Sequence, residues 1–319
     1  MTYQPELLVT AGSTEEVARL LEAGANAVVV GEEKYGVRLP GNMTPDRIEA
    51  SLLHARAREA KLYVAVNNIF HNDRLQDLAD YLRCLEKLKV DAIVFGDPAV
   101  LMTARSAALM TARSAAPSLK LHWNAEMTST NYKTAKYWQK RGASRIVAAR
   151  ELNMEQLLEM KQQLPDMDVE IQVHGMTNIY HSKRHLVNHY FAHIGEHDEI
   201  GRADMSRKLF LIEQERREEK YPIFEDANGT HIMSSDDICV LEDLKPLLDA
   251  RVDSFKIEGL LKSVSYNETV VKVYREAIDS YLRDPEQYRF KEEWMDRIRA
   301  VQDPERELSF GFFYKDQVY

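Results

Sequence analysis

Short apolar runs rich in β-branched residues alternate along the chain with longer segments in which apolar residues recur at helical spacing. The apolar runs cover residues 7–12, 27–32, 61–67, 92–97, 120–126, 145–150, 169–175 and 253–259. The helical segments cover residues 14–24, 45–60, 73–89, 98–116, 131–142, 154–164, 243–251 and 265–282. Strands that alternate with helices require crossover connections, which produce a parallel sheet. Eight such units predict an α/β fold, a (β/α)8 barrel of the TIM type.

The regular alternation stops between the seventh and eighth strands. Residues 176–238 are more polar, and this stretch is too long for an ordinary connecting loop. We therefore expect a barrel over residues 1–284 that includes the long excursion 176–238. A C-terminal tail, residues 285–319, is expected to pack on the barrel.

One helical segment contains a tandem duplication. The sequence LMTARSAA occurs at 101–108 and again, unchanged, at 109–116. Eight residues of α-helix turn through about 800°, so the second copy is rotated by some 80° from the first. The second copy therefore cannot face the barrel as the first does. We interpret it as a local duplication in an outer helix, where extra length is tolerated.

Most of the predicted strands end in polar residues. These residues are Thr10, Glu32, Asn67, Asp97, Asn124, Glu126, Arg150, Glu151, His174, Lys256 and Glu258. In such barrels the loops at the C-terminal ends of the strands converge on one opening, and the active site lies there. Ionisable groups crowded at an opening are costly unless they are used, which favours function for Glu126, Arg150, His174, Lys256 and Glu258. Thr10 and Asp97 are interpreted as helix caps or turn residues rather than as functional groups.

Composition and charge exclude several classes of protein. The chain is 45% apolar and 29% charged, as in globular proteins with a sizeable core. A net charge of −9 argues against the broad basic surface of an autonomous nucleic-acid binder, so an RNA contact must use a local patch or a partner. The first residues lack a signal-peptide pattern, and no apolar run reaches the roughly 18 residues of a membrane span. We expect a cytoplasmic protein with no membrane contact.

The chain has only two cysteines, Cys84 and Cys239. Two are too few for a disulfide framework or for an all-cysteine metal or iron–sulfur site. Cys84 falls on the apolar face of a helical segment and is expected in the core. Cys239 is interpreted as a small apolar residue, and a weak role as a metal ligand stays open.

Four histidines in the excursion recur at a four-residue step. They are His181, His185, His189 and His193. On a helix they would form one stripe, in which neighbours such as His181 and His185 could chelate a metal but all four could not meet one ion. Zincins have a glutamate directly after the first of two such histidines, whereas Ser182 and Lys183 follow His181 here. The alternatives are a solvated helix face, or a small patch of Lys183, Arg184 and His185 that contacts RNA phosphates.

Several long motifs of the chain are also distinctive. They are PELLVTAGSTEEVARLLEAGANAVVVGEEKYGVR, VNNIFHN, ARELNMEQL, VEIQVHGMTNIYHSKRHL, DDICVLEDLKPLLDARVDSFKIEGLLKSVSY and ELSFGFFY. Together they cover nearly the whole chain, and they resemble the collagenase-like peptidases, the thirty-second family of peptidases of unknown catalytic type. This family includes proteins that hydroxylate tRNA, ribosomal RNA and ubiquinone.

The resemblance implies an iron–sulfur cluster that this chain cannot hold in the family manner. Family members of the tRNA type generally bind the cluster with four cysteines. Two of these match Asn178 and His185 here, and a third belongs within 195–208, which has no cysteine. The fourth matches Cys239, so one expected thiolate remains. The resemblance therefore implies that no cluster is held by this chain alone and that a cluster-bearing paralogue is its partner.

The resemblance also implies a substrate and roles for the polar residues. Short chains of this type work in a pair that installs 5-hydroxyuridine at the wobble position of tRNA, with prephenate as the implied oxygen source. Arg150 and Lys256 would then hold the carboxylates of a prephenate-like diacid. Glu126 and Glu258 would orient these cations or move protons, and His174 would act as general acid or base. Asn67 and Asn124 are further candidates for binding the substrate.

Two other functions are consistent with the family. A peptidase needs an activated nucleophile or a metal-bound water, and the chain has no G-x-S-x-G or HExxH motif. A catalytically silent scaffold for the active paralogue is the other alternative. The retained polar residues at the predicted opening argue against a pure scaffold.

Overall fold

A computed structural model describes residues 3–75, 77–105, 118–124, 128–196, 199, 201 and 203–315. Eight parallel strands close into a barrel, as predicted, because the last strand pairs with both the first and the seventh. They are β1 (Glu6–Thr10), β2 (Ala27–Gly31), β3 (Lys61–Val66), β4 (Ala92–Phe95), β5 (Lys120–Trp123), β6 (Ala143–Val147), β7 (Asp168–Gly175) and β13 (Ser254–Ile257). The outer faces of these strands are apolar and almost wholly buried against the surrounding helices.

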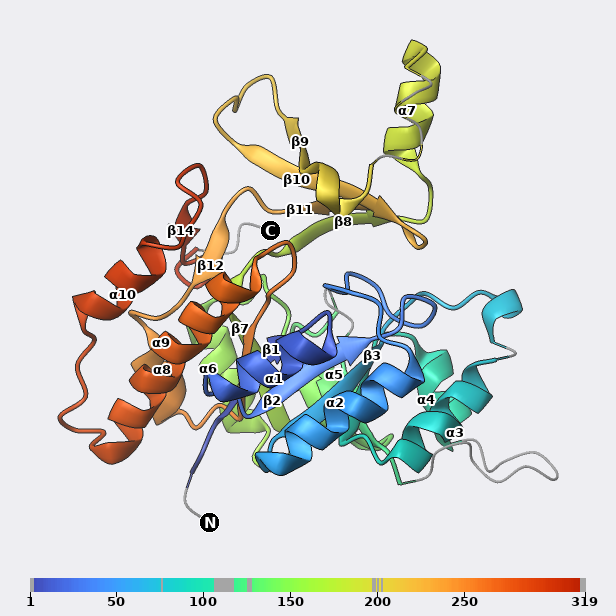
Figure 1. The fold of residues 1–319 in the computed structure, drawn as a ribbon. Coiled ribbons are helices and arrows are strands. Elements are labelled where there is room, and N and C mark those ends of the chain that lie inside the picture. Colours follow the sequence, from blue (N-terminus) through green and yellow to red (C-terminus); the bar gives the residue numbers. More distant parts are fainter. Residues whose placement is uncertain are drawn as a thin grey trace.

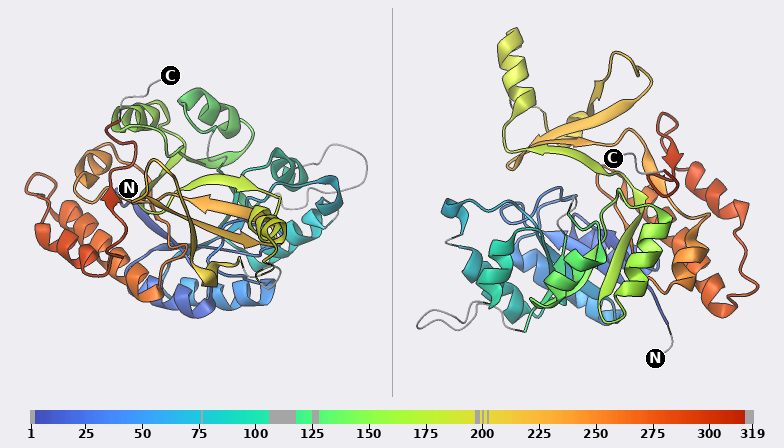
Figure 2. Two further views of the ribbon diagram at one scale, coloured as in Figure 1. Left: turned by 90° about the horizontal axis from the view of Figure 1, so that it is seen from above. Right: turned by 180° about the vertical axis from the view of Figure 1, so that it is seen from behind.

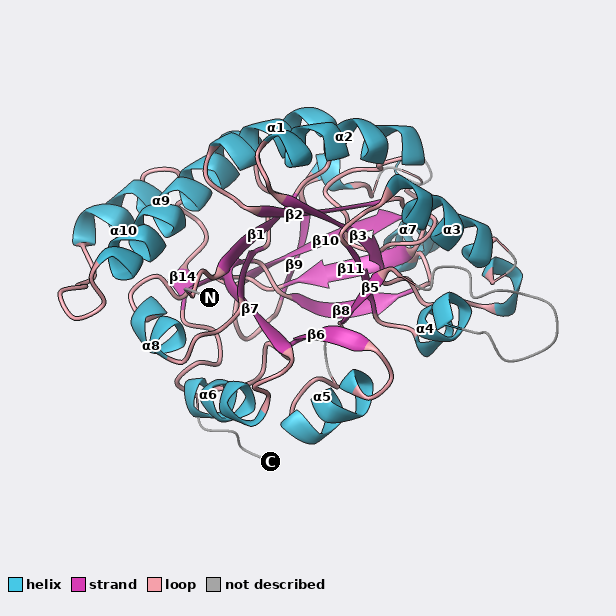
Figure 3. Cartoon of the chain, turned by 90° about the horizontal axis from the view of Figure 1, so that it is seen from below, coloured by secondary structure: helices cyan, strands magenta, loops and turns pink. Residues whose placement is uncertain are grey.

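A ring of helices surrounds the barrel (Figure 3). Its members are α1 (Thr14–Glu22), α2 (Pro45–Ala57), α3 (Leu78–Leu88), α4 (Pro98–Arg105), α5 (Tyr132–Gln139), α6 (Met154–Gln163), α8 (Leu244–Asp249) and α9 (Val264–Arg283). Side chains that cap the helix define where several of these helices begin. Asn153 and Gln156 form a reciprocal capping box at α6, for example. The third helix begins later than predicted, after a short 3₁₀ turn (Asn72–Arg74). Most of the tandem duplication lies outside the described residues.

The excursion forms an antiparallel sheet of four strands, which we call the excursion sheet. Its order is β8 (Asn178–Ser182), β11 (Gly229–Met233), β10 (Lys220–Asp226) and β9 (Leu209–Ile212). The sheet lies across the C-terminal end of the barrel, and α7 (Leu186–Ile194) projects from it (Figures 1 and 2). A 3₁₀ turn (Met205–Arg207) precedes β9. The chain returns to the barrel through β12 (Asp237–Cys239), which pairs antiparallel with β7.

The last part of the chain packs on the side of the barrel. Trp294, Met295 and Ile298 are the buried residues of α10 (Glu292–Arg299), which lies against α9. The short strand β14 (Leu308–Ser309) then pairs with β12. Asp237 of β12 is fully buried, and it accepts hydrogen bonds from Gln302 and Arg306 of this tail. No helix among the described residues is long and apolar enough to cross a membrane.

The opposite end of the barrel contains a buried ionic cluster. The Arg145 guanidinium donates to Glu6 Oε1 at 2.5 Å and to Glu170 Oε2 at 3.2 Å. The Tyr63 hydroxyl donates to Glu6 Oε2 at 2.6 Å. Although burial opposes it, Arg145 lowers the pKa of Glu6 to about 2. This N-terminal end of the barrel is therefore closed by paired charges, and the open end lies under the excursion sheet.

Candidate functional site

Polar side chains from the ends of several strands gather at the open end of the barrel. A cavity of roughly 840 Å³ lies between this end and β8, and a small recess lies deeper in the barrel. The residues that line both levels are Val37, Arg38, Asn67, Asn124 and Arg150. We call the two levels together the mouth. Its size lies within the range of ligand-binding pockets, about 300–1,000 Å³.

Lys256 and Glu258 form an ion pair in the deeper level. The Lys256 ammonium lies 2.9 Å from Glu258 Oε2, and both side chains are largely buried. Glu258 Oε1 accepts hydrogen bonds from the Thr10 hydroxyl at 2.8 Å and from Leu260 N at 3.2 Å. Burial opposes ionisation, but Lys256 outweighs it and lowers the pKa of Glu258. Lys256 thus favours the carboxylate form of Glu258, and Thr10 serves to hold this carboxylate.

Two arginines complete the positive side of the mouth. Arg150 lies just beyond β6 and donates to the backbone oxygen of Asn178 at 3.3 Å. Arg38 lies in the loop after β2 with a left-handed backbone, φ 54°. Asn67 Oδ1 accepts a hydrogen bond from Val37 N at 3.1 Å, which anchors this loop. With Lys256, the two arginines suit a ligand that carries more than one carboxylate.

His174, another predicted catalytic residue, stands apart from these groups. Glu126 lies outside the described residues. His174 is fully buried and does not line either level of the mouth. Its Nε2 lies 2.8 Å from the Tyr266 hydroxyl of α9, and burial lowers the pKa of its imidazole to about 4. Its contact with the mouth is through the backbone, because its carbonyl accepts from Glu258 N at 2.9 Å.

The excursion sheet is fastened to the loops that form the mouth. Asn228, in the turn between β10 and β11, donates to the backbone oxygens of Glu33 and Gly36. Asn68 donates to Asn228 Oδ1 at 2.7 Å. The Lys183 ammonium donates to the backbone oxygen of Ile69. These bonds hold β8 over the mouth at a fixed place.

The histidine row does not form one helical stripe, so this prediction is wrong. His181 lies in β8, where its ring stacks on His231 and its Nε2 contacts the backbone oxygen of Asn228. His185 precedes α7 and faces Glu225, with 3.6 Å between Nδ1 and Oε2. Within the described residues, no three His, Cys, Asp or Glu side chains are grouped to hold a metal ion. Lys183 is partly buried, and Arg184 and His185 are exposed; the RNA contact of these three residues stays a prediction.

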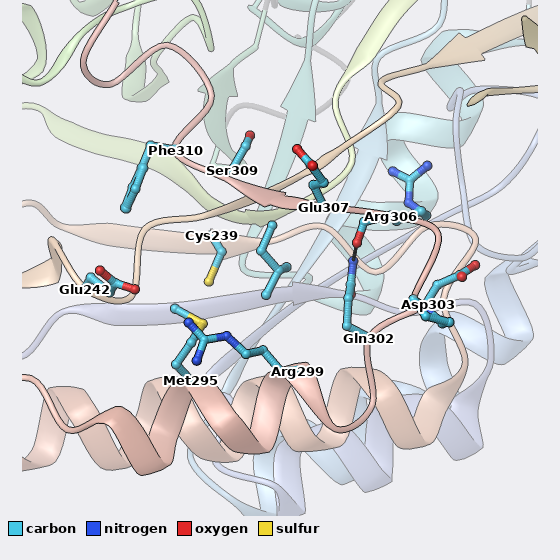
Figure 4. Close-up of a pocket in the computed structure, with 12 residues that line it drawn as sticks. Cys239, Glu242, Met295, Arg299, Gln302, Asp303, Arg306, Glu307, Ser309 and Phe310 are labelled. Atoms are coloured by element: carbon cyan, nitrogen blue, oxygen red, sulfur yellow. Dashed lines mark hydrogen bonds between the residues drawn. The ribbon is translucent and has the colours of Figure 1, made fainter. Parts of the chain in front are cut away.

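The positions that match the family's cluster ligands do not fit an iron–sulfur cluster in this chain. Cys239 is buried in β12, and its sulfur lies 3.8 Å from the Tyr274 hydroxyl. Burial raises the pKa of this thiol to about 11, which opposes the thiolate form that iron requires. A cavity of roughly 380 Å³ lies on its other side, where Figure 4 shows the thiol directed toward Met295. Asn178 lines the mouth and offers only an amide.

Arg38 and Phe312 are mouth residues that were not predicted. Arg38 lies in a loop whose preceding residues are held by hydrogen bonds, from Val37 N to Asn67 Oδ1 and from Asn228 to the backbone oxygen of Gly36. Phe312 comes from the C-terminal tail, which is fixed beside the barrel where Met154 N donates to the backbone oxygen of Phe313. The only signal in the sequence was the apolar and aromatic character of residues 307–314.

The fold and the mouth define an α/β-barrel protein with a pocket, lined by both cationic side chains and carboxylates, beneath an inserted antiparallel sheet. The chain belongs to peptidase family U32, whose family model matches residues 12–318. It is 48% identical to tRNA hydroxylation protein P2 of Bacillus subtilis (strain 168), with 99% of each chain covered. It is 30% identical to tRNA hydroxylation protein P1 of the same organism, covering 100% of this chain and 74% of that one.

Solved structures support the same fold. The structure of a U32 peptidase has a TM-score of 0.50 and 14% identity, covering 81% of this chain and 94% of that chain. At this identity the likeness concerns the fold alone.

Proposed function

We propose that this protein takes part in the 5-hydroxylation of wobble uridine in tRNA, with prephenate as co-substrate. The observation that carries the proposal is the convergence of Arg38, Arg150 and Lys256 on one cavity in a chain that closely resembles a tRNA hydroxylation protein. Such a function is carried out in the cytoplasm.

The proposed site for the dicarboxylate is the floor of the 840 Å³ cavity, where it meets the deeper level, because the deeper level, at roughly 40 Å³, has no room for the whole molecule. Lys256 and Arg150 bind its carboxylates, since charge-assisted hydrogen bonds are strongest where water is excluded. Glu258 is a positioning residue, because it holds the Lys256 ammonium at 2.9 Å and is itself held by Thr10. Asn67 positions the loop of Arg38, and Asn124 lines both levels of the mouth. His174 supports Glu258 through its backbone.

A cluster-bearing paralogue is the proposed partner. The positions that match the family's ligands do not fit a cluster in this chain, so the redox group must come from another chain. The surface proposed for it is the apolar stripe of α7, formed by Leu186, Tyr190 and Ile194 at four-residue steps. No residue of α7 is buried, and exposed apolar surfaces of this kind typically contact other proteins. The helix is separated from β8 by three residues and projects from the excursion sheet away from the barrel (Figure 1), so the proposed partner binds on the side of the sheet that faces away from the barrel.

Among the described residues, no contact in the mouth favours peptidase activity. Ser182 and His181 are adjacent in β8, and neighbouring residues of a strand point to opposite faces of the sheet. They therefore do not form a nucleophile and base.

The first test is mass spectrometry of tRNA nucleosides from cells grown without oxygen, with and without the gene. The gene deletion should remove 5-hydroxyuridine derivatives at the wobble position. Complementation with Lys256→Ala or Arg150→Ala should fail, whereas Lys245→Ala, which changes a partly exposed lysine of α8 outside the mouth, should restore the modification. Full modification in the deletion strain would exclude the proposed function. Full restoration by both mouth variants would instead indicate a scaffold.

A further inference from the structure

The side-chain oxygen of Asn178 is buried at the mouth without a hydrogen-bond donor among the described residues. Asn178 opens β8 and lines the 840 Å³ cavity. Buried side-chain oxygens normally have a donor, so an unpaired one in a residue that lines a cavity calls for a donor, which a bound ligand or an ordered water supplies.

The backbone around Asn178 is fixed on both sides. Thr177 N donates to the Ser234 hydroxyl, and Ser234 N donates to the backbone oxygen of Thr177. The pairing of β8 with β11 shifts register between Ile232 and Met233, the partner of Asn178. Such bulges redirect side chains next to functional sites. The amide is therefore held in the cavity wall by the fold.

The 840 Å³ cavity, which is the upper level of the mouth, also has an apolar and aromatic lining. Tyr180 and Phe312 each keep 45% of their surface exposed, and Ile179 lies between Asn178 and Tyr180 in the same strand. Enzymes that act on a base in RNA or DNA place it in a pocket that stacks on aromatic rings and reads its Watson–Crick edge through hydrogen bonds. An amide with a free acceptor and two aromatic rings are the groups that such a pocket needs.

We propose that the upper level of the mouth binds the target uracil base, with Asn178 Oδ1 accepting its N3–H and with Tyr180 and Phe312 stacking on its ring. This inference rests on the proposed function and adds the residues that recognise the base. Arg150 lines both levels and donates to the backbone of Asn178, so it joins the base site to the site proposed for the dicarboxylate. Both reactants then lie in one cavity, one above the other.

Binding of anticodon stem-loop RNA tests the role of Asn178. The probes are one RNA with uridine at the wobble position and the same RNA with 3-methyluridine there, which lacks N3–H. The full chain, alone and mixed with its cluster-bearing paralogue, should bind the uridine RNA at least about tenfold more tightly. The Asn178→Ala variant removes the acceptor and makes room for the methyl group, so its preference should fall to near one.

Stacking is tested separately, in case the asparagine variant folds poorly. Tyr180→Leu should weaken binding of the uridine RNA about tenfold, within the range found for loss of base stacking. Tyr137→Leu, on α5 with a similar exposed fraction of 48%, should leave it unchanged.

Two results would overturn the inference. One is the absence of any preference for uridine in the unmodified chain, alone and in the mixture. The other is an unchanged preference in Asn178→Ala together with unchanged binding by Tyr180→Leu. If the gene deletion still removes 5-hydroxyuridine, these results reject the base site and leave the proposed function standing. If the deletion leaves the nucleosides unchanged, the proposed function itself is wrong.

Discussion

The Asn68 amide donates a hydrogen bond of 2.7 Å to Asn228 Oδ1, and this bond joins the barrel to the excursion sheet. Both side chains are almost completely buried, although one follows β3 and the other lies in the turn between β10 and β11. Asn228 also donates to the backbone oxygens of Glu33 and Gly36. The side chain thus links three segments that surround the mouth.

Asn228→Ala should release the excursion sheet while leaving the barrel folded. The change removes three hydrogen bonds and leaves buried polar groups unpaired, which costs about 1–3 kcal/mol for each unpaired group. Hydrogen exchange should become faster in β10 and β11, with little change in β1 to β4. Gln214→Ala, an exposed residue between β9 and β10, is the matched control. Equal exchange in both variants would show that the link is not needed.

Lys256→Met should weaken binding of prephenate by about 10–100-fold. This range follows from the loss of a hydrogen bond to a charged group, worth about 1.5–3 kcal/mol. Glu258→Gln should have a smaller effect, since it loosens the ammonium without removing it. Calorimetric titration measures both, with Lys245→Met as the control. Equal affinity in all three variants would place the dicarboxylate elsewhere.

The barrel was predictable because strands and helices differ in the period of their apolar residues, and all eight predicted strands form. Which side chains at the strand ends face the mouth was predictable only in part. The residues of β7 and β13 pair in order up to Gln172 and Lys256, and then His174 pairs with Ile257. This irregularity turns His174 away from the mouth and toward α9. A local bulge of this kind leaves no periodic signal in the sequence.

The excursion was harder to predict, because its contacts are distant in sequence. The four-residue step of the histidines suggested a helix, but pairing with β11 places His181 in a strand. Asn228 acquires its position through hydrogen bonds to the backbone oxygens of Glu33 and Gly36, roughly 190 residues earlier in the chain. The sequence did not predict the ionic cluster around Arg145, because its members lie at the starts of strands or within them rather than at the strand ends that form the mouth.

Arg145→Met should destabilise the whole protein by about 3–5 kcal/mol. Removing one member of a buried ion pair leaves uncompensated charge, here on Glu6 and Glu170, and this magnitude is typical of such changes. Urea unfolding measures the free energy of unfolding. Arg141→Met, an exposed arginine four residues earlier, is expected to change it by less than about 0.5 kcal/mol. Similar losses in the two variants would mean that the cluster is not important for stability.

His174 should make the protein less stable as the pH falls from about 6.5 to 4. Burial lowers the pKa of its imidazole to about 4 in the folded state, below the value of about 6.5 in unfolded chains. Between these values the unfolded chain binds the extra proton, so the free energy of unfolding falls as the pH falls. The loss attributable to His174 approaches about 3 kcal/mol at the lower end.

The pH dependence is checked by comparing unfolding of the unmodified chain and His174→Phe at pH 7, 5.5 and 4. The variant should show a shallower decline, whereas His71→Phe, an exposed histidine, should decline like the unmodified chain. An unchanged slope in His174→Phe would assign the acid sensitivity to other groups, such as His122, whose pKa burial also lowers.

Tyr190→Asp should prevent association with the cluster-bearing paralogue. Leu186, Tyr190 and Ile194 form an exposed apolar stripe, and a carboxylate at its centre would have to be desolvated in an interface. His189→Asp adds the same charge to the neighbouring histidine side of α7, so it controls for the effect of charge on the helix itself. Copurification and sedimentation of the two chains measure association, and tRNA nucleosides report the consequence. Loss of both association and 5-hydroxyuridine in Tyr190→Asp alone would place the partner on this stripe. Normal association would move the interface elsewhere, because a desolvated carboxylate at its centre could not be tolerated.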